Sequence, residues 1–367
     1  MLPFQMAPPM FPFFKLPAVA REAAIQDWDV DQVIESTMLS DIFREQLENY
    51  RYSCEKLTWF LFKNPSMEIT NKKTTVSIRF KNMDDQTYTP VRKINGTYHF
   101  FNKEPKKTDM IGENFVQWYF HVDEDTFECK MRMLEEITKF LMNILKDASL
   151  NLECGLRDSN LTVKDLFIWK FTKSFTYFNI HDHSPGPNIS PEDLVFLLED
   201  IKAETRSMNI EVADFEYDKP IQGKDIHINN TGWVTAECLK GPEVVQITIS
   251  SESFNYNEII RHWVSGGSPN LESIQFNYHG SEPDPLQVFD GLNKKPTVFT
   301  EEDLDYRGSC SLPEDGHDIR RKGDGRLCTI VTEGDYMLAM LIWHQKHLKF
   351  LEQETRDRLK LEYGIQL

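Results

Sequence analysis

The hydrophobic and polar positions at the start of the chain follow the spacing of amphipathic helices. After a proline-rich opening, apolar residues recur every three or four positions, which places them on one face of an α-helix. Asp29 and Asp31 can cap a second helix in this stretch. The pattern predicts a helical module over residues 11–52, preceded by a flexible N-terminus over residues 1–10. Because a module this small has little core of its own, it is expected either to pack on the rest of the chain as a helical hairpin or to bind a partner's groove.

Residues 57–147 change to short runs of β-branched and aromatic residues. Turn signals such as Asn64-Pro65 and Asn95-Gly96 separate the runs, so they predict an antiparallel sheet. An apolar stripe at helical spacing follows over residues 126–147, and we expect this long helix to cover one face of the sheet. The predicted strands are 57–62, 74–80, 97–101 and 115–122.

Residues 148–345 alternate strand patterns with helix signatures. Pro191 suits the first position of one helix, residues 235–239 suggest a second, and Asn255 or Asn257 can cap a third. Strand starts recur every 20 to 30 residues or so, the period of leucine-rich repeats, which predicts an irregular leucine-rich-repeat-like α/β region. The predicted strands are 175–180, 208–212, 225–229, 244–249 and 272–276.

The tail combines a hairpin-like run, an apolar run and a charged end. The run Gly323–Val331 has the glycines of a tight turn, and Tyr336–Trp343 is apolar enough to be buried. Residues 346–367 are predicted to form a charged C-terminal helix, and the segment Gln353–Glu362 can remain solvated.

Charge and cysteine usage narrow the classes of partner. The net charge of −17, from 58 acidic and 41 basic residues, argues against a nucleic-acid partner, because phosphate binding depends on clustered Lys and Arg. No apolar run approaches the roughly 20 residues that span a membrane. Residues 1–20 share features with a signal peptide, but five prolines interrupt the apolar stretch and no basic residues begin it.

The six cysteines form no C-x-x-C pair, so we expect reduced core residues rather than a zinc site.

Two histidine clusters are candidates for a catalytic or metal-binding site. His181-Asp-His183 has the spacing of a metal-binding pair and supports an alternative hypothesis, a metal-dependent hydrolase. However, it runs into a Pro/Gly loop, where polar residues are common anyway. His317-Asp318 could pair a base with an orienting acid, but no nucleophile motif accompanies it. The sequence therefore predicts no catalytic, cofactor-binding or metal-binding residues and no enzyme activity.

Several segments resemble those of one family. Phe11-Pro-Phe-Phe-Lys-Leu-Pro17 is similar to the opening of an F-box, and Leu39-Ser40 matches the Leu-Ser pair of its second helix. Downstream, residues 318–330 are similar to an Arg-x-Asp-Gly-x-x-Ala-Thr-Ile segment, and an apolar stretch ending in Trp343 follows them. Together the segments resemble a nematode-expanded F-box protein family with a type 2 F-box-associated domain. Its further motifs match Trp233, Asn257, Ile260, Trp263-Val264, Gly266, Pro269 and Leu271-Glu272.

The resemblance implies a protein-binding adaptor of the ubiquitin-conjugation pathway. The N-terminal helices would bind the Skp-family adaptor of a cullin-RING ubiquitin ligase, and the rest would capture an unknown protein substrate. Asp41, Phe43 and Glu45 stand where many relatives have basic residues. The alternative is therefore a binding scaffold or decoy with a degenerate F-box and no ubiquitin-ligase role. The residues that the resemblance assigns to adaptor contact are Leu16, Pro17, Ile25, Val33, Ile34, Met38 and Leu39.

Pattern and resemblance together predict an α+β chain in an intracellular location, the cytoplasm, the nucleus or both. No substrate-binding residue is assigned, because recognition loops carry no general code. The predicted parts are an F-box-like helical module (11–52), an antiparallel sheet with a long covering helix (57–147), an F-box-associated, leucine-rich-repeat-like recognition domain (148–345) and a charged C-terminal helix (346–367).

Overall fold

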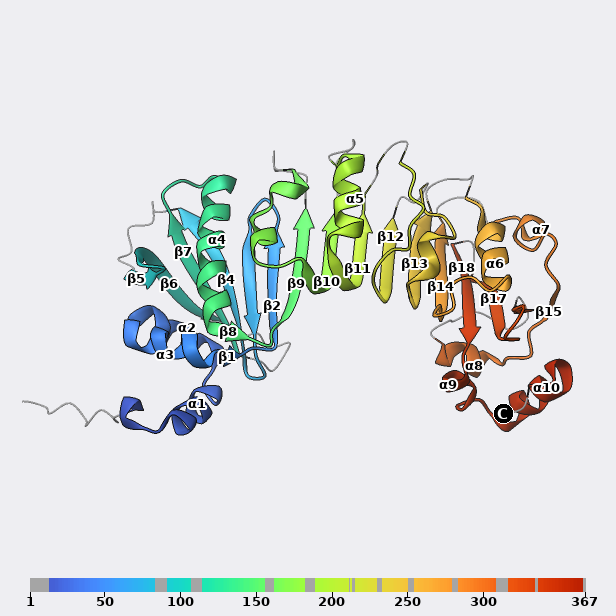
Figure 1. Ribbon diagram of the computed structural model, residues 1–367, viewed down its shortest axis with the longest axis horizontal. Coiled ribbons are helices and arrows are strands. Elements are labelled where there is room, and N and C mark those ends of the chain that lie inside the picture. The colour runs from blue at the N-terminus through green and yellow to red at the C-terminus, as the bar shows by residue number, and fades with distance from the viewer. Residues whose placement is uncertain are drawn as a thin grey trace, which may run out of the picture. The chain divides into compact units, whose positions relative to one another are not determined.

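A computed structural model gives a mixed α/β protein with ten α-helices among the described residues (Figure 1). The chain divides into two compact units, Met1–Glu153 (unit 1) and Cys154–Leu367 (unit 2). The described residues are 13–82, 91–106, 114–155, 162–181, 189–210, 212, 215–229, 233–249, 254–278, 283–307, 316–333 and 336–365.

Unit 1 begins with helices, as the apolar spacing predicts. Asp29 is the N-cap of the second helix, and the Ser40 hydroxyl caps the third by accepting from the Phe43 N–H over 3.2 Å. Phe13, Trp28 and Phe43 pack their rings together, with Trp28 and Phe43 stacked at 5.5 Å between centroids. The elements are the 3₁₀ helix η1 (Phe13–Lys15) and the helices α1 (Ala18–Gln26), α2 (Val30–Leu39) and α3 (Asp41–Tyr50).

The sheet of unit 1 is mixed, so the prediction of a purely antiparallel sheet was wrong. Strand β4 (Thr74–Asn82) pairs in parallel with β7 (Asn114–Val122). The reason is topological: β5, β6 and β7 form an antiparallel meander whose last strand, rather than its first, lies beside β4. The strand order is β9-β2-β3-β4-β7-β6-β5. The other strands are β1 (Tyr52–Ser53), β2 (Lys56–Leu61), β3 (Ser66–Thr70), β5 (Val91–Ile94), β6 (Thr97–Lys106), β8 (Leu145–Lys146) and β9 (Ser149–Gly155).

The long helix α4 (Phe127–Ile144) covers one face of this sheet, as predicted (Figure 1). Thr126 caps it by accepting from the Cys129 N–H over 3.2 Å. The Trp59 indole N–H donates to Thr138 of α4 over 3.0 Å, so a buried hydroxyl satisfies a buried ring nitrogen. Under the helix lies a row of fully buried side chains in register across four strands: Trp59, Met67, Ile78 and Trp118.

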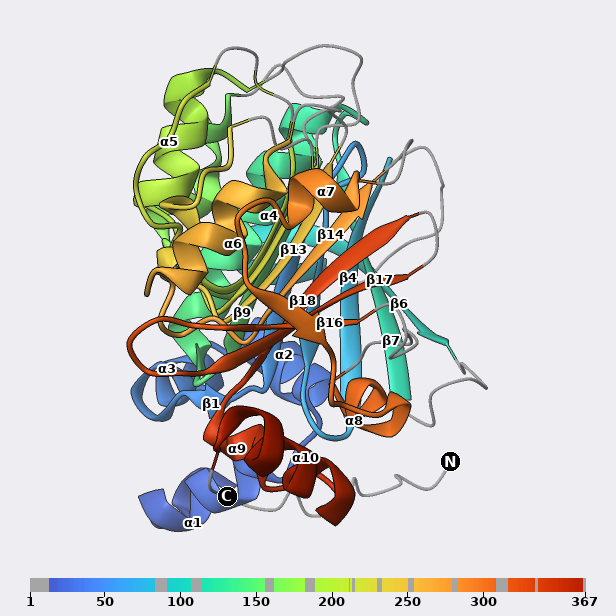
Figure 2. The ribbon, with the colours of Figure 1, turned by 90° about the vertical axis from the view of Figure 1, so that its right-hand side faces the viewer.

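Unit 2 opens with five strands that all pair in parallel, with helices on one face (Figures 1 and 2). Two predicted strands, 225–229 and 244–249, are confirmed with the same bounds, but the strand predicted at 208–212 begins earlier, at Lys202. The helix predicted at 235–239 is only a 3₁₀ turn. The elements are η2 (Val163–Asp165), η3 (Phe167–Lys170), β10 (Ser174–His181), α5 (Pro191–Glu199), β11 (Lys202–Asn209), β12 (Asp225–Asn229), η4 (Cys238–Lys240), β13 (Val244–Ile249), α6 (Tyr256–Val264) and β14 (Ser273–Tyr278).

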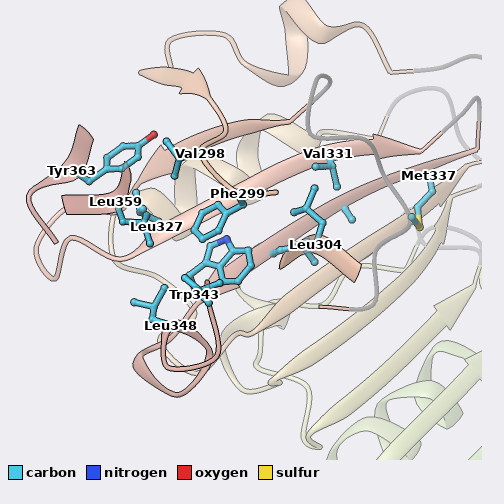
Figure 3. Close-up of a cluster of buried hydrophobic side chains, with 13 residues drawn as sticks. Val298, Phe299, Leu304, Leu327, Val331, Met337, Trp343, Leu348, Leu359 and Tyr363 are labelled. Atoms are coloured by element: carbon cyan, nitrogen blue, oxygen red, sulfur yellow. The ribbon is translucent and has the colours of Figure 1, made fainter. Parts of the chain in front are cut away.

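The rest of unit 2 adds antiparallel strands beside β14 and short helices. Residues Met337–Trp343 are buried as predicted, whereas Tyr336 is exposed, and the segment forms a strand. The helices pack a C-terminal apolar cluster around Phe299 and Trp343, whose rings stack at 3.8 Å (Figure 3). The elements are α7 (Pro285–Val288), β15 (Lys294–Pro296), α8 (Glu301–Tyr306), β16 (His317–Arg320), β17 (Leu327–Glu333), β18 (Met337–Trp343), α9 (Gln345–Leu348) and α10 (Gln353–Tyr363).

The charged C-terminal helix forms, and most of its side chains are exposed, as expected. One side of α10 is nevertheless buried, because Thr355, Leu359 and Tyr363 are buried, and Leu359 and Tyr363 belong to the C-terminal apolar cluster (Figure 3). The sequence pattern did not reveal this buried side, because only every fourth residue of the helix faces the cluster and the charged majority dominates the pattern.

Among the described residues, no helix is both long and apolar enough to cross a membrane. Cys54, Cys154, Cys238 and Cys328 are buried free thiols, as core packing predicts, and Cys129 is half-buried. Burial raises the pKa of Cys54 to about 11 and that of Cys154 to about 12, so these thiols stay protonated at neutral pH. Cys310 lies outside the described residues.

Candidate functional site

The seven residues assigned to adaptor contact divide by exposure. Leu16 is partly buried, and Pro17 and Leu39 are exposed. The other four are buried within this chain: Ile25, Val33, Ile34 and Met38. A buried side chain can support an interface from behind, but it cannot contact a partner while the helices keep this packing. Direct contact therefore rests on Leu16, Pro17 and Leu39.

Ion pairs to the sheet of unit 1 explain why α2 is held in place. Lys103 of β6 contacts Asp31 over 2.6 Å and Glu35 over 3.3 Å, and Arg92 of β5 contacts Glu35 over 2.8 Å. Burial raises the pKa of Glu35, but the Arg92 hydrogen bond and the Lys103 charge outweigh it, and the pKa is lowered. The helical module therefore packs on its own chain, which was one of the two arrangements expected from its size.

Apolar side chains remain exposed where α2 meets α3. Leu39 is 63% exposed and Ile42 is 61% exposed, and only the cap Ser40 and Asp41 separate them in the sequence. We call Leu39 and Ile42 the α2–α3 corner. Val19 of α1 is also exposed. Sequence periodicity included Ile42 in the same apolar pattern as Phe43 and Leu47, but in the structure only Phe43 and Leu47 are buried.

In unit 2 the motifs that carry the family resemblance meet one another. The Arg321 guanidinium donates to the carbonyls of Gly266 and Gly267, and its carbon lies 5.5 Å from the centre of the Trp263 ring. The Lys322 N–H donates to the Val264 carbonyl over 2.8 Å. Orphan carbonyls at the C-terminal end of α6 are thus satisfied by the turn between β16 and β17.

Three further motif residues, Pro269, Leu271 and Glu272, join the same contact, whereas Trp233 packs against Phe215 and Tyr217 and Asn257 donates to the Val288 and Asp290 carbonyls. Arg326 donates to the Pro269 carbonyl over 2.7 Å, and the His344 ring lies 2.8 Å from the Leu271 carbonyl. The Ile342 N–H donates to the Glu272 carbonyl over 2.8 Å. The motifs therefore act as one structural junction between α6, the β16–β17 turn and the segment after β18, and we call it the motif junction.

Comparisons with protein-family models, with curated proteins and with solved structures found no match.

The two histidine clusters differ in how far the structure describes them. His181 lies at the end of β10, 2.8 Å from the Asn179 amide nitrogen, but Asp182 and His183 are outside the described residues. Among the described residues, no group of three or more His, Cys, Asp or Glu side chains could hold a metal ion.

Asp318, the acid of the second histidine cluster, is buried and accepts hydrogen bonds that stabilise the fold. Its carboxylate accepts from the Thr297 and Thr329 hydroxyls over 2.8 and 2.7 Å, from the Val298 N–H over 3.0 Å and from the Tyr363 hydroxyl over 3.2 Å. Burial raises the pKa of Asp318, and the four donors only partly compensate. A carboxylate held by four donors fastens α10 to the sheet of unit 2.

Sequence reasoning missed a polar face on the parallel strands β10–β14. Because paired residues of neighbouring strands point to the same side of a sheet, the pairing aligns two polar rows on the side opposite the buried apolar side chains. Each strand ends in a polar-apolar-polar triplet, the signal that could have revealed these rows. The polar sheet face consists of Asn179, Ser207, His227, Gln246 and Gln275 in one row and His181, Asn209, Asn229, Thr248 and Asn277 in the next.

Proposed function

We propose that this chain is a non-catalytic, intracellular substrate-recognition subunit of a Skp/cullin/F-box-type ubiquitin ligase. Helices α1–α3 would bind the Skp-family adaptor, and unit 2, as an F-box-associated, leucine-rich-repeat-like domain, would bind the protein substrate. The observation that carries the proposal is the exposed α2–α3 corner. One of its two residues, Leu39, belongs to the Leu39-Ser40 pair of the F-box-like segment.

The corner fits a partner interface on physical grounds. Two apolar side chains that are each more than 60% exposed leave apolar surface in water that association would bury. Scattered exposed apolar residues are ordinary, so the argument rests on their coincidence with the resemblance. The buried α2 residues Val33, Ile34 and Met38 would then hold the corner in a fixed orientation from behind.

The contribution to ubiquitin transfer would be proximity. An adaptor bound to unit 1 and a substrate bound to unit 2 would raise the effective concentration of a substrate lysine near the conjugating enzyme. No covalent step is assigned to this chain.

The first test measures binding of the full chain to a purified Skp-family adaptor by calorimetry. The double substitution Leu39→Asp, Ile42→Asp places two charges in the proposed apolar interface, and we expect a loss of at least about 30-fold in affinity, corresponding to about 2 kcal/mol. The matched control is Leu286→Asp in unit 2, because Leu286 is also an exposed leucine, at 83%. It should bind like the parent.

Far-UV circular dichroism of the variants shows whether the fold is retained. Ile34→Asp is unsuitable as an interface probe, because Ile34 is buried and the charge would disrupt unit 1. A folded parent chain that shows no adaptor binding at micromolar concentration would refute the F-box assignment.

One observation favours the second candidate, a scaffold or decoy with a degenerate F-box. Arg44 is the single basic residue of the stretch 41–48, and its guanidinium already contacts Asp41 over 2.7 Å and Glu48 over 3.8 Å. A reconstituted ligase decides between the two candidates. Adaptor-dependent ubiquitination of a bound partner supports the leading proposal, and stable partner binding without ubiquitination supports the scaffold.

A further inference from the structure

We propose that the polar sheet face of unit 2 binds an extended, uncharged segment of a partner protein through the peptide groups of that segment. The inference deepens the proposed function, on which it rests, because it names the class of substrate segment that unit 2 captures.

The geometry supplies two straight rows of hydrogen-bonding groups. The five strands pair in register, so each row takes one side chain from every strand, for example His227 beside Gln246 and Gln246 beside Gln275. Neighbouring strands lie about 4.8 Å apart, so each row extends about 19 Å across the sheet. That length accommodates about six residues of an extended chain laid across the strands.

Most of these groups have hydrogen-bonding capacity to spare. Two pairs are joined along their own strands, Asn179 with His181 over 2.8 Å and Gln275 with Asn277 over 3.1 Å. The Asn179 side chain is only 7% exposed, and its carbonyl oxygen has no hydrogen-bond partner. In the described part of the chain, no side-chain hydrogen bond is made by Ser207, Asn209, His227, Asn229, Gln246 or Thr248.

The chemistry of the rows selects a neutral ligand. None of the ten residues is acidic, and none is Lys or Arg, although 27% of the chain is charged and its net charge is −17. Phosphate and carboxylate ligands form their strongest side-chain hydrogen bonds with Arg and Lys, which the rows lack. A primary amide offers one donor group and one acceptor, as a peptide bond does, so Asn and Gln can pair with both sides of a ligand's peptide group.

A peptide fits better than a glycan. The ten positions include no Phe, Tyr or Trp, so their only aromatic side chains are the two smaller histidine rings, which give a sugar ring little surface to stack on. A polyproline II segment has no internal hydrogen bonds, and it repeats about every 9.3 Å, close to two strand spacings of about 9.6 Å. Its free peptide groups would therefore face equivalent positions on every second strand.

The test uses the full chain and synthetic peptides of defined composition, with binding followed by fluorescence anisotropy. The probe is a labelled twelve-residue peptide of Pro-Gln-Ser repeats with blocked ends. Peptides with Glu or Lys in place of Gln carry the opposite charges, and a linear neutral hexasaccharide serves as the glycan competitor. We expect saturable binding of the neutral peptide, at least about 10-fold weaker binding of both charged peptides, and no competition by the hexasaccharide.

Substitutions on the face test the location. The double change His227→Leu, Gln246→Leu removes two polar groups that make no side-chain hydrogen bond to any residue that the structure describes, so the fold should remain intact. Losing two ligand hydrogen bonds is expected to weaken binding about 5- to 150-fold. The control Gln287→Leu removes an exposed glutamine from α7 and should bind like the parent.

Three outcomes would overturn the inference: no binding of the neutral peptide, equal binding of a charged peptide, or parent-like binding by the folded face variant. Displacement by the hexasaccharide would instead assign the face to a glycan and would equally refute the peptide proposal. Adaptor binding measured on the same preparations separates the two proposals. If the peptide binds at the face and the adaptor does not bind, only the ubiquitin-ligase proposal fails.

Discussion

At the residue scale, buried polar groups fasten the C-terminal end of unit 2. Asp318 accepts from Tyr363 of α10, and Asp303 of α8 accepts from the Thr355 hydroxyl of the same helix over 2.7 Å. Both carboxylates are almost fully buried. Each carboxylate accepts other hydrogen bonds as well, so removing one of these donors should cost the net value of one hydrogen bond to a charged group, typically about 1.5–3 kcal/mol. Specific polar contacts, in addition to apolar packing, therefore determine where α10 lies.

Burial favours the neutral form of His347 as it does that of Asp318, but for a base this lowers the pKa. Burial and the nearby charge of Arg307 lower the pKa of His347 to about 4. The backbone N–H of His344 donates to Nδ1 of His347 over 3.2 Å. Nδ1 therefore acts as an acceptor, which fits a neutral His347 ring. Protonating Nδ1 would place a hydrogen against that N–H, because both atoms would then be donors.

We predict a pH dependence of stability from this histidine. An unfolded histidine has a pKa of about 6.5, so between about pH 6.5 and pH 4 the unfolded state binds more protons than the folded state. Stability should therefore fall as pH falls through this window. His347→Asn keeps an acceptor for the His344 N–H but does not titrate. Melting temperatures measured from pH 4 to 7 should change less steeply for the variant, and parallel profiles would contradict the prediction.

At the element scale, α10 depends on a narrow apolar side. Leu359 packs in the C-terminal apolar cluster (Figure 3) and is 0% exposed. Leu361, two residues further along, is 83% exposed. Weak intrinsic amphipathicity means that the helix owes its place to a few residues rather than to a broad face.

The two leucines give a matched pair for testing this dependence. Leu359→Ala should destabilise unit 2 by about 2–5 kcal/mol, because it leaves a cavity in a packed cluster. Leu361→Ala should change stability by no more than about 0.5 kcal/mol. Urea unfolding followed by circular dichroism measures both values. Equal effects of the two substitutions would show that α10 does not pack as described.

In unit 2, arginine side chains from outside the helix donate hydrogen bonds to carbonyls at the C-terminal ends of α5 and α6. Arg206 is fully buried and donates to the Leu197 and Ile201 carbonyls, each over 2.5 Å, at the C-terminal end of α5. Burial lowers the pKa of Arg206 to about 10, which still leaves the guanidinium charged at neutral pH. Arg321 does the same for α6 in the motif junction. Both arginines complement the negative end of a helix dipole.

At the scale of the whole molecule, local patterns predicted most elements but not their pairing. Strand β12 alternates polar and apolar residues over its full length, and β13 does so from Val245 onward, so their bounds were predictable. Strand β5 has only four residues, two of them charged, which gives too little pattern to detect. The parallel pairing of β4 with β7 depends on a long-range topological choice that no local window contains.

The candidate sites show the same limit. Periodicity identified Val33, Ile34 and Met38 as one apolar face of α2, but it could not show that the chain's own sheet covers that face. Lys103 and Arg92, which hold α2 there, are about 60 or more residues away in the sequence. The polar sheet face likewise requires the register of five strands, because each triplet alone is an ordinary strand end.

The alkylation rates of the buried thiols report how often each unit unfolds transiently. Only a thiolate reacts with iodoacetamide, so Cys54 in unit 1 and Cys328 in unit 2 become reactive only during transient unfolding. We predict that half-buried Cys129 is alkylated first among the five cysteines that the structure describes, and that Cys54 and Cys328 follow at rates set by the opening free energy of their own unit. Time-resolved mass spectrometry of each cysteine peptide measures these rates. Alkylation of Cys54 or Cys328 as fast as Cys129 would show that the corresponding core is open in solution.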